Sequence, residues 1–194
     1  PTGCKAEWSE QQGKIVLTHY EYKDGVNLHL PTGRAYSIGS NCFKNDWKLK
    51  SVVIPEDVIE IRQSAFQESG LLQVTVPMNV RVLGNDVFAD CHYLTQAEIE
   101  GTEKTGERVF ARCESLQKVK LGYGVIRIEE GALSIRLVEI ELPTTLGQID
   151  KLAFSYCKLK EIIYDGDWEA KRSELENNKN IGKENDLLLA AKQK

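Results

Sequence analysis

The stretch LGNDVFADCHYLTQAEI, residues 83–99, decides the fold, because its order of residue types returns along the chain. A Phe or Leu marks each copy, at positions 43, 66, 88, 110, 133 and 154. The intervals between these positions are 23, 22, 22, 23 and 21 residues. A fixed period in this range is typical of a chain that stacks similar units into a solenoid. We therefore predict about six stacked units of about 22 residues.

A second series of apolar residues, of the form L-x-x-V-x-I, lies between these markers. Its leading leucines are at positions 49, 71, 94, 116, 137 and 159. The last two apolar residues of each copy alternate with a more exposed position, which is typical of a short strand. Proline follows the strand at Pro55, Pro77 and Pro143, where its missing N–H ends the hydrogen-bonded ladder. Stacked units would form a parallel β-sheet on one face and bury the Phe series on the opposite side of the core.

The combined pattern I-G-x-x-A-F-x-x-C-x-x-L-x-x-V-x-I-P resembles the BspA-like leucine-rich repeats, also called the Treponema pallidum type. Cys91, Cys113 and Cys157 each follow the marker aromatic by three residues, where that family often has cysteine. Residues 163–169 resemble the segment that closes such arrays, and residues 4–13 are similar to their lead-in. The resemblance implies an α/β repeat solenoid that is exposed on, or secreted from, bacterial cells and is used in adhesion.

The two ends of the chain are expected to cover the open ends of the core, as solenoids require. Residues 14–20 and 26–30 flank Asp24 and Gly25, a strong turn signal, and predict an N-terminal β-hairpin whose second strand joins the main sheet. The polar segment 168–194 predicts a C-terminal helical cap. The expected division is an N-terminal cap at 1–35, leucine-rich repeats at 36–166 and a C-terminal cap or tail at 167–194.

The fourth unit departs from the pattern. Its residues 100–106 read EGTEKTG, which is one residue shorter than the equivalent stretches and lacks their inward Val and Ile. We expect an outward bulge or a locally thin core here, and therefore the weakest link in the stack.

Composition excludes two classes of partner. The chain has 194 residues, of which 41% are hydrophobic, and a formal net charge of −4. Nucleic-acid binding usually needs a concentrated basic face, which this mild negative charge does not favour. No run approaches the roughly 18 apolar residues of a membrane span. We predict no nucleic-acid partner and no membrane span in this chain.

Catalytic and metal-binding signals are weak. His19 and His29 lie on the predicted hairpin, whose register does not pair them. Cys91 is next to His92, but neighbouring residues often point apart, so buried and inert thiols are the favoured interpretation. A disulfide between Cys91 and Cys113 is the alternative, since neighbouring units lie close enough to permit one. With no CxxC pair and no P-loop, the sequence predicts no catalytic residue, no metal site and no cofactor.

The outward positions of the predicted strands are the candidate binding site. Stacked strands lie about 4.8 Å apart, so charged residues at equivalent positions become direct neighbours. One interpretation is a charge ladder that holds the register of the stack, and the other is a polar binding surface on the open sheet, where solenoids usually bind. Spacing alone does not support calcium binding by the acidic members. The candidate residues are Gln96, Glu98, Lys118, Lys120, Glu139, Glu141 and Glu161.

Three functions are compatible with the sequence. The first is a non-catalytic adhesion or protein-binding module, which the resemblance places outside the cell and pairs with an extracellular or host or microbial surface protein. The second is a passive structural spacer within a larger surface protein. The third is an enzyme, which would need a catalytic constellation hidden in the N-terminal cap. The first is favoured, because an open solenoid lacks the deep concave pocket that small-molecule chemistry prefers.

Overall fold

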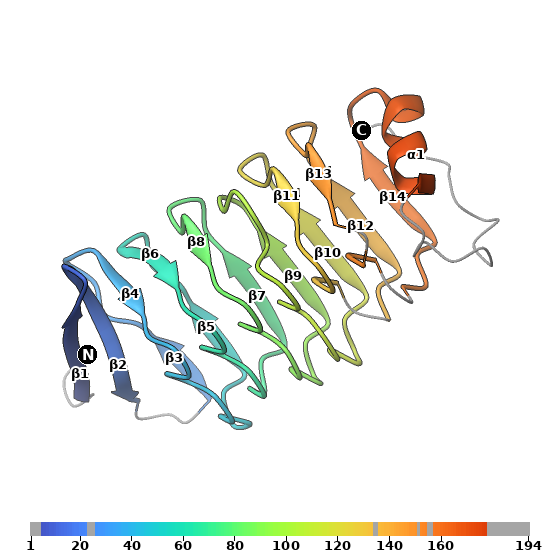
Figure 1. Ribbon diagram of the computed structural model, residues 1–194. Helices are drawn as coiled ribbons and strands as arrows, with labels where there is room; N and C mark the ends of the chain where they lie inside the picture. Colours follow the sequence, from blue (N-terminus) through green and yellow to red (C-terminus); the bar gives the residue numbers. More distant parts are fainter. Residues whose placement is uncertain (1–4, 23–25, 134–135, 151, 155–156, 178–194) are drawn as a thin grey trace.

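Alternating apolar residues produce short parallel strands that stack into a β-solenoid of about six turns of about 22 residues, here called coils (Figure 1). The computed structural model describes residues 5–22, 26–133, 136–150, 152–154 and 157–177. The coils follow one another along a single axis, so β1 (Lys5–Gln11) and α1 (Trp168–Asn177) lie at opposite ends of an elongated molecule.

The main sheet runs along one face. Its five strands are parallel and lie in the order β14-β12-β10-β9-β7. In each strand the second and fourth residues are buried, while the first and third point outward. The strands are β7 (Gln73–Val76), β9 (Gln96–Ile99), β10 (Lys118–Leu121), β12 (Glu139–Leu142) and β14 (Glu161–Tyr164). A separate parallel pair, β3 (Asn27–His29) and β5 (Ser51–Val53), continues this face towards the N-terminus.

A second sheet covers another side of the solenoid. β1 (Lys5–Gln11) pairs antiparallel with β2 (Lys14–Glu21), which pairs parallel with β4 (Tyr36–Ile38). β6 (Val58–Ile61) and β8 (Val82–Leu83) complete the sheet in the order β1-β2-β4-β6-β8. On the same side, β11 (Arg127–Ile128) and β13 (Gln148–Ile149) form a separate two-stranded sheet.

The third side consists of turns centred on the Phe series, here called Phe turns. Residues two before and two after the marker residue have a left-handed backbone, with φ between 52° and 63°. The amide N–H groups of these residues and of the marker donate to carbonyls of the next coil, as Asn41, Phe43 and Asn45 do. Asn and Asp tolerate this conformation well, but Glu68 and Arg112 adopt it too, so the inter-coil ladder outweighs local preference. The left-handed positions are 41, 45, 64, 68, 86, 90, 108, 112 and Gly131.

The Phe rings form a continuous stack inside the core. The ring centroids of Phe43 and Phe66 lie 5.1 Å apart, and those of Phe88 lie 5.6 Å and 5.7 Å from Phe66 and Phe110. Phe154 is fully buried in the last coil. From Phe43 to Phe110 each ring therefore contacts the ring one coil away, which is how the stack gains stability by adding coils.

The two sides of the solenoid other than the main sheet correct the expected α/β class. Within the described residues these sides consist of short strands and turns, and α1 (Trp168–Asn177) is the helix that is present. A coil of 22 residues closes with extended backbone, because the second strand and the Phe turn use up the residues that a helix would need.

The predicted 14–31 hairpin was wrong in its pairing. β2 pairs with β1 through a turn at Gln12 and Gly13, both of which have positive φ (53° and 73°), the geometry of a type I′ hairpin turn. The pairing of β1 also brings the Trp8 ring edge-on to the Tyr36 ring, with 5.1 Å between the ring centroids. The predicted hairpin would not make this contact. The second predicted strand does join the main face, since β3 pairs in parallel with β5. Asp24 and Gly25 lie outside the described residues.

At the C-terminal end α1 follows the last strand. The Asp167 side chain accepts a hydrogen bond from the Ala170 amide at 3.2 Å, which caps the helix N-terminus. Leu175 is buried, and the Lys171 ammonium donates to the Leu146 carbonyl at 2.7 Å. No described helix is long and apolar enough to cross a membrane. The rest of the predicted C-terminal cap, residues 178–194, falls outside the described part of the chain.

The fourth coil fills its inward positions with threonine. Thr102 and Thr105 are fully buried where the other coils place Val, Leu or Ile. The Thr105 hydroxyl accepts a hydrogen bond from the Glu129 amide at 3.1 Å, whereas the Thr102 hydroxyl has no partner among the described residues. The core is therefore more polar here.

Candidate functional site

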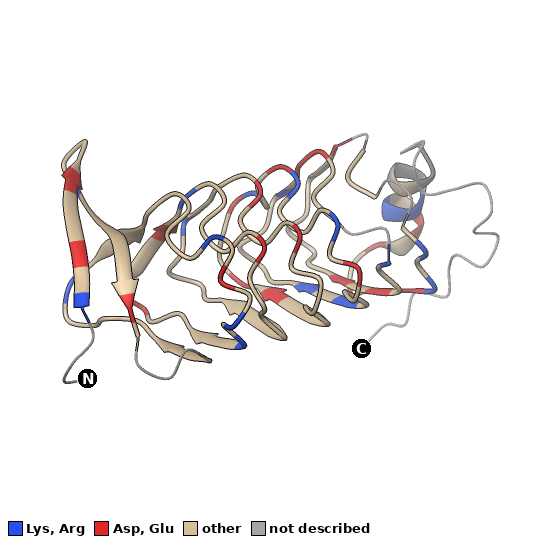
Figure 2. Ribbon diagram, turned by 90° about the horizontal axis from the view of Figure 1, so that it is seen from below, with Lys and Arg blue, Asp and Glu red and all other residues tan. Residues whose placement is uncertain are grey.

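Strand pairing brings the candidate residues into one charged strip, defined as Gln96, Glu98, Lys118, Lys120, Glu139, Glu141 and Glu161. Lys118 lies opposite Gln96 on one side and Glu139 on the other, while Lys120 lies between Glu98 and Glu141. Acidic and basic residues thus lie on neighbouring strands, as the view from below in Figure 2 shows. The strip is a direct consequence of a parallel register between coils of nearly equal length.

The two lysines are fixed by ion pairs that point in opposite directions. The Lys118 ammonium lies 2.7 Å from the Glu139 carboxylate on β12, and the Lys120 ammonium pairs with Glu98 on β9. The pKa of each lysine is raised, first by the hydrogen bond to its partner and further by the surrounding glutamates. The face therefore carries a negative potential around two ordered ammonium groups.

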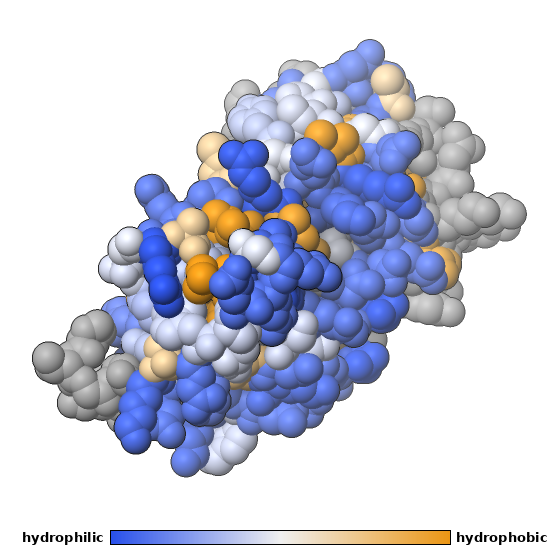
Figure 3. All heavy atoms as spheres, turned by 60° about the vertical axis from the view of Figure 1, so that its left-hand side comes forward, coloured by the Kyte–Doolittle hydropathy of each residue, from blue (hydrophilic) through white to orange (hydrophobic). Residues whose placement is uncertain are grey.

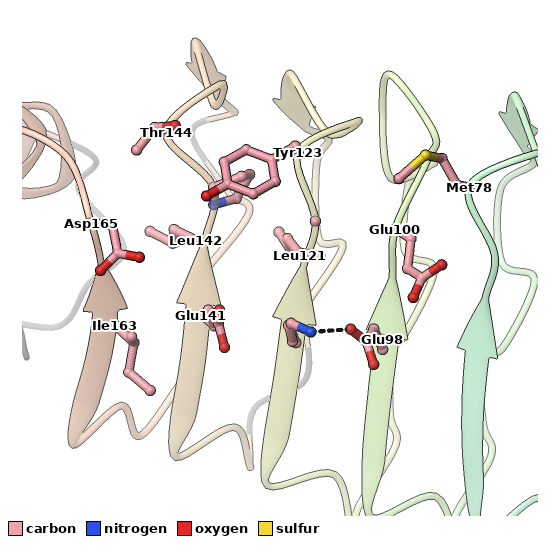
Figure 4. Close-up of a pocket in the computed structure, with 13 residues that line it drawn as sticks. Met78, Glu98, Glu100, Leu121, Tyr123, Glu141, Leu142, Thr144, Ile163 and Asp165 are labelled. Atoms are coloured by element: carbon pink, nitrogen blue, oxygen red, sulfur yellow. Dashed lines mark hydrogen bonds and ion pairs between the residues drawn. The ribbon is translucent and has the colours of Figure 1, made fainter. Parts of the chain in front are cut away.

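A pocket of about 290 Å³ opens where β9, β10, β12 and β14 end. Figure 4 shows its side chains arriving from successive coils, with Glu100 on one side of the Tyr123 ring and Thr144 and Asp165 on the other. Gly122 lets its turn lie close to the turn of the previous coil, because a Cβ on Gly122 would lie only 2.9 Å from the Glu100 backbone. The pocket is lined by Met78, Glu98, Glu100, Lys120, Leu121, Gly122, Tyr123, Glu141, Leu142, Pro143, Thr144, Ile163 and Asp165.

The pocket combines acidic and apolar groups. Four carboxylates, those of Glu98, Glu100, Glu141 and Asp165, face one ammonium group, that of Lys120. Met78 and Tyr123, at its rim, are large apolar side chains that remain 68% and 66% exposed. In the view of Figure 3, exposed apolar side chains form small patches with hydrophilic residues around them. The arrangement can bind a group with both a positive charge and an apolar surface.

The candidate residues contribute unequally. Glu98, Lys120 and Glu141 line the pocket. Gln96 and Lys118 line a smaller hollow of about 180 Å³ over β7, β9 and β10, which Glu98 and Lys120 share. Glu139 and Glu161 begin β12 and β14, at the ends of these strands that are farther from the pocket.

The pocket residues that sequence reasoning missed include Met78, Glu100, Tyr123 and Asp165. They lie in the turns that follow the strands, beyond the alternating positions that mark a strand. A signal was present for two of them, because Glu100 and Asp165 each come directly after the last strand residue, where other coils have proline or glycine. Aligning the repeats one position further would have placed both acids on the same edge.

The histidines do not form a site. His19 lies on β2 opposite Glu7, His29 lies on β3 opposite Val53, and His92 lies in a turn, so each comes from a different part of the solenoid. Among the described residues no group of three or more His, Cys, Asp or Glu side chains is arranged to hold a metal ion.

Cys91 and Cys113 are buried thiols, as the favoured interpretation predicts, and the disulfide alternative is wrong. Cys91 and Cys113 are free, and their thiols donate to the carbonyls of Phe66 at 3.2 Å and Phe88 at 3.1 Å. Burial raises the pKa of Cys91 to about 11 and that of Cys113 well above its ordinary value. Both thiols therefore stay protonated near neutral pH, which makes them poor nucleophiles.

Comparison with known proteins agrees with this architecture. A sequence profile described as the BspA type leucine rich repeat region matches in six copies, over residues 36–160 and 106–181. The comparison with curated protein sequences finds no match.

Solved structures of similar fold come from bacteria. The leucine rich repeat protein of Treponema pallidum is similar with a TM-score of 0.60 and 20% identity, over 82% of this chain and 82% of that one. The pneumococcal vaccine antigen PcpA gives 0.63 and 16%, over 88% of this chain and 45% of that one. A leucine-rich repeat protein from Eubacterium ventriosum gives 0.50 and 16%, over 78% and 50%. The chain thus spans about half the length of the last two proteins, and at these identities the likeness concerns the fold.

Proposed function

Because the chain belongs to the family of BspA-type leucine-rich-repeat proteins, we propose that it is a non-catalytic protein-binding module. The binding surface is the outward face of the main sheet, formed by the charged strip and the pocket at its edge. One observation carries the proposal: ordered charges on this face lead into a pocket whose rim exposes Met78 and Tyr123. Exposed aromatic and thioether side chains are typical of protein-interaction sites.

The ion pairs give the face a fixed pattern of charge. Lys118 and Lys120 are each held by a glutamate on a neighbouring strand, so their ammonium groups lose little further freedom when a partner binds. A fixed pattern favours a partner with the complementary pattern and repels others. This supports a specific partner rather than general adhesiveness.

The proposed partner is an extracellular, host or microbial surface protein, and the proposed location is the cell surface or the extracellular space. Support comes from the fold neighbour PcpA, a pneumococcal vaccine antigen. Within the module, residues 36–166 form the repeats, and residues 1–35 and 167–194 act as the caps. Contacts at both ends of the core support the capping role, since Trp8 packs against Tyr36 at one end and Leu175 is buried at the other.

A passive spacer is the second candidate function. The ion pairs of Lys118 and Lys120 join neighbouring coils, so they also hold the register of the stack. A spacer needs this register but needs no exposed aromatic rim, which is why binding is preferred.

The test measures binding of the purified chain to a panel of extracellular-matrix and microbial-surface proteins at low and high salt. Lys118→Glu/Lys120→Glu reverses the charges of the strip, and Lys44→Glu/Lys158→Glu makes the same charge change at two exposed sites away from the main sheet. Saturable binding that the first variant loses and the second keeps supports the proposal. A folded chain that binds no member of the panel supports the spacer instead.

A further inference from the structure

We infer that the pocket at the ends of β9, β10, β12 and β14 takes a lysine or arginine side chain from an extended segment of the partner protein. The inference rests on the proposed function, because it states which chemistry the same face recognises. It is carried by the charge of the pocket, by its apolar rim and by its size.

The charge of the pocket favours a cation. Glu100, Glu141 and Asp165 come from three different coils and line one pocket, so their negative potentials add. The one ammonium group of the lining, that of Lys120, is directed to Glu98 at the side of the pocket (Figure 4). The raised pKa of Lys120, caused by its bond to Glu98 and by Glu141 and Glu100 nearby, agrees with a negative potential.

The apolar rim favours an organic cation over a metal ion. Lysine and arginine carry an apolar stem and a charged head group, which matches a lining that combines the acids with Leu121, Leu142 and Ile163. The exposed ring of Tyr123 can face the head group in a cation–π contact. The carboxylates are not gathered as metal ligands, since no metal-binding group occurs among the described residues.

The size of the pocket sets how much of the partner it takes. Its volume of about 290 Å³ is at the lower end for ligand pockets, enough for one or two side chains but not for a folded element. The hollow lined by Gln96 and Lys118 continues from it along the sheet, so the neighbouring residues of an extended segment can lie there.

The experiment follows the amide signal of Gly122 in the NMR spectrum of the labelled chain during titration with the peptide Ser-Leu-Arg-Leu-Arg-Leu-Ser. Gly122 lines the pocket, while Gly13 in the N-terminal hairpin turn is the internal reference. The matched peptide carries citrulline in place of both arginines, which keeps the shape and removes the charge. We expect saturable shifts at Gly122 with the arginine peptide and about tenfold weaker binding of the citrulline peptide.

Variants locate the effect. Glu100→Gln/Glu141→Gln should weaken binding of the arginine peptide about tenfold, whereas Glu68→Gln/Glu114→Gln, an equal charge change at two exposed sites outside the pocket, should leave it unchanged. Tyr123→Ala, which removes an exposed ring without touching the core, should weaken it as well. Retained spectra of the remaining amides establish that each variant is folded.

Each failure has a separate meaning. Equal binding of the two peptides, shifts confined to residues outside the pocket, or no saturable shift at all would overturn the inference. Panel proteins that still bind through Lys118 and Lys120 would then leave the proposed function standing. A chain that takes the arginine peptide in the pocket but binds no panel protein would support the inference and remove the proposed class of partner.

Discussion

At the scale of the residue, the fourth coil shows how one hydroxyl group can differ from another in the same core. Thr102 and Thr105 are both fully buried and three positions apart, at sites that carry apolar residues in the other coils. The Thr105 hydroxyl accepts a hydrogen bond from the Glu129 amide. The Thr102 hydroxyl is buried away from water and has no hydrogen-bond partner among the described residues. A buried polar group without a partner lowers stability, and a paired one does not.

Substituting valine at the two sites should therefore have opposite effects. We expect Thr102→Val to raise the free energy of unfolding by about 1 kcal/mol, because it removes an unsatisfied hydroxyl at nearly constant volume. Thr105→Val should lower it by about 1 kcal/mol, because the Glu129 amide loses its acceptor. Urea unfolding followed by circular dichroism measures both values. Equal effects of the same sign would contradict the assigned hydroxyl contacts.

At the scale of the element, successive Phe turns are joined by lateral ion pairs. Arg108 lies one coil after Asp86 and donates two hydrogen bonds of 2.9 Å to its carboxylate, and Arg112 pairs with Asp90 in the same way at 2.6 Å. All four residues occupy left-handed positions of the turn, which hold their side chains in line along the stack. The turns thus combine a backbone ladder with a side-chain ladder.

The Asp90–Arg112 pair predicts a pH-dependent share of stability. The hydrogen bond from Arg112, aided by Gln67, lowers the pKa of Asp90 below its ordinary value. A lowered folded pKa contributes stability that is present above the unfolded pKa of about 3.9 and is lost as pH falls through the folded pKa. Asp90→Asn, which tolerates the left-handed backbone, should cost about 1 kcal/mol at pH 7, and this cost should shrink as pH falls through the folded pKa of Asp90.

Chemical unfolding of both proteins between pH 2 and pH 7 measures this difference. Arg112→Gln serves as the control, because it removes the other half of the pair and should flatten the same part of the pH profile. The double variant should lose little more than either single variant at pH 7. A difference between wild type and Asp90→Asn that stays constant with pH would show that the pair does not hold the carboxylate charged.

At the scale of the whole molecule, the second sheet is interrupted in the middle. It ends at β8 in the third coil and resumes with the β11–β13 pair. Between them the fourth coil contributes a single bridge, from Lys104 to Arg127, which faces the later coils. Within the described residues the two halves of the solenoid are therefore joined by backbone hydrogen bonds of the main sheet and the Phe turns, whereas on this side they are packed together, as Gly106 is against Gly84, without strand pairing.

Hydrogen exchange should detect the interruption. We expect the amides of residues 100–106 to exchange about tenfold faster on average than those of residues 78–84, the equivalent stretch of the previous coil. In that stretch the amides of Arg81 and Gly84 donate hydrogen bonds to the carbonyls of Ile59 and Ile61 in the coil before. Within the described residues, the fourth coil has no equivalent hydrogen bonds to the third. Mass spectrometry of peptides spanning the two stretches provides the comparison, and equal protection would mean that the coils open as one unit.

The sequence alone predicted the repeat, the inward residues and the charged strip. Phe88 and its equivalents recur at a nearly constant interval, so their burial follows from one physical requirement, that each coil covers its apolar side with the next. Glu98 and Lys120 likewise occupy equivalent positions, and a parallel register makes equivalent positions neighbours. The inward positions and the register of the main sheet therefore needed no further information, whereas the backbone on the other two sides of the coils did.

Tertiary structure decided what is not periodic. Asp24 and Gly25 are as good a turn signal as Gln12 and Gly13, and only packing against the first coil, through Trp8 on Tyr36, selects the pairing of β1 with β2. The pocket belongs to the same class, since Glu100 and Asp165 are 65 positions apart in the chain and line one pocket because turns of unlike sequence stack on one edge. Local sequence determines which residues face inward in a repeat, whereas the meeting of unlike turns depends on how neighbouring coils pack.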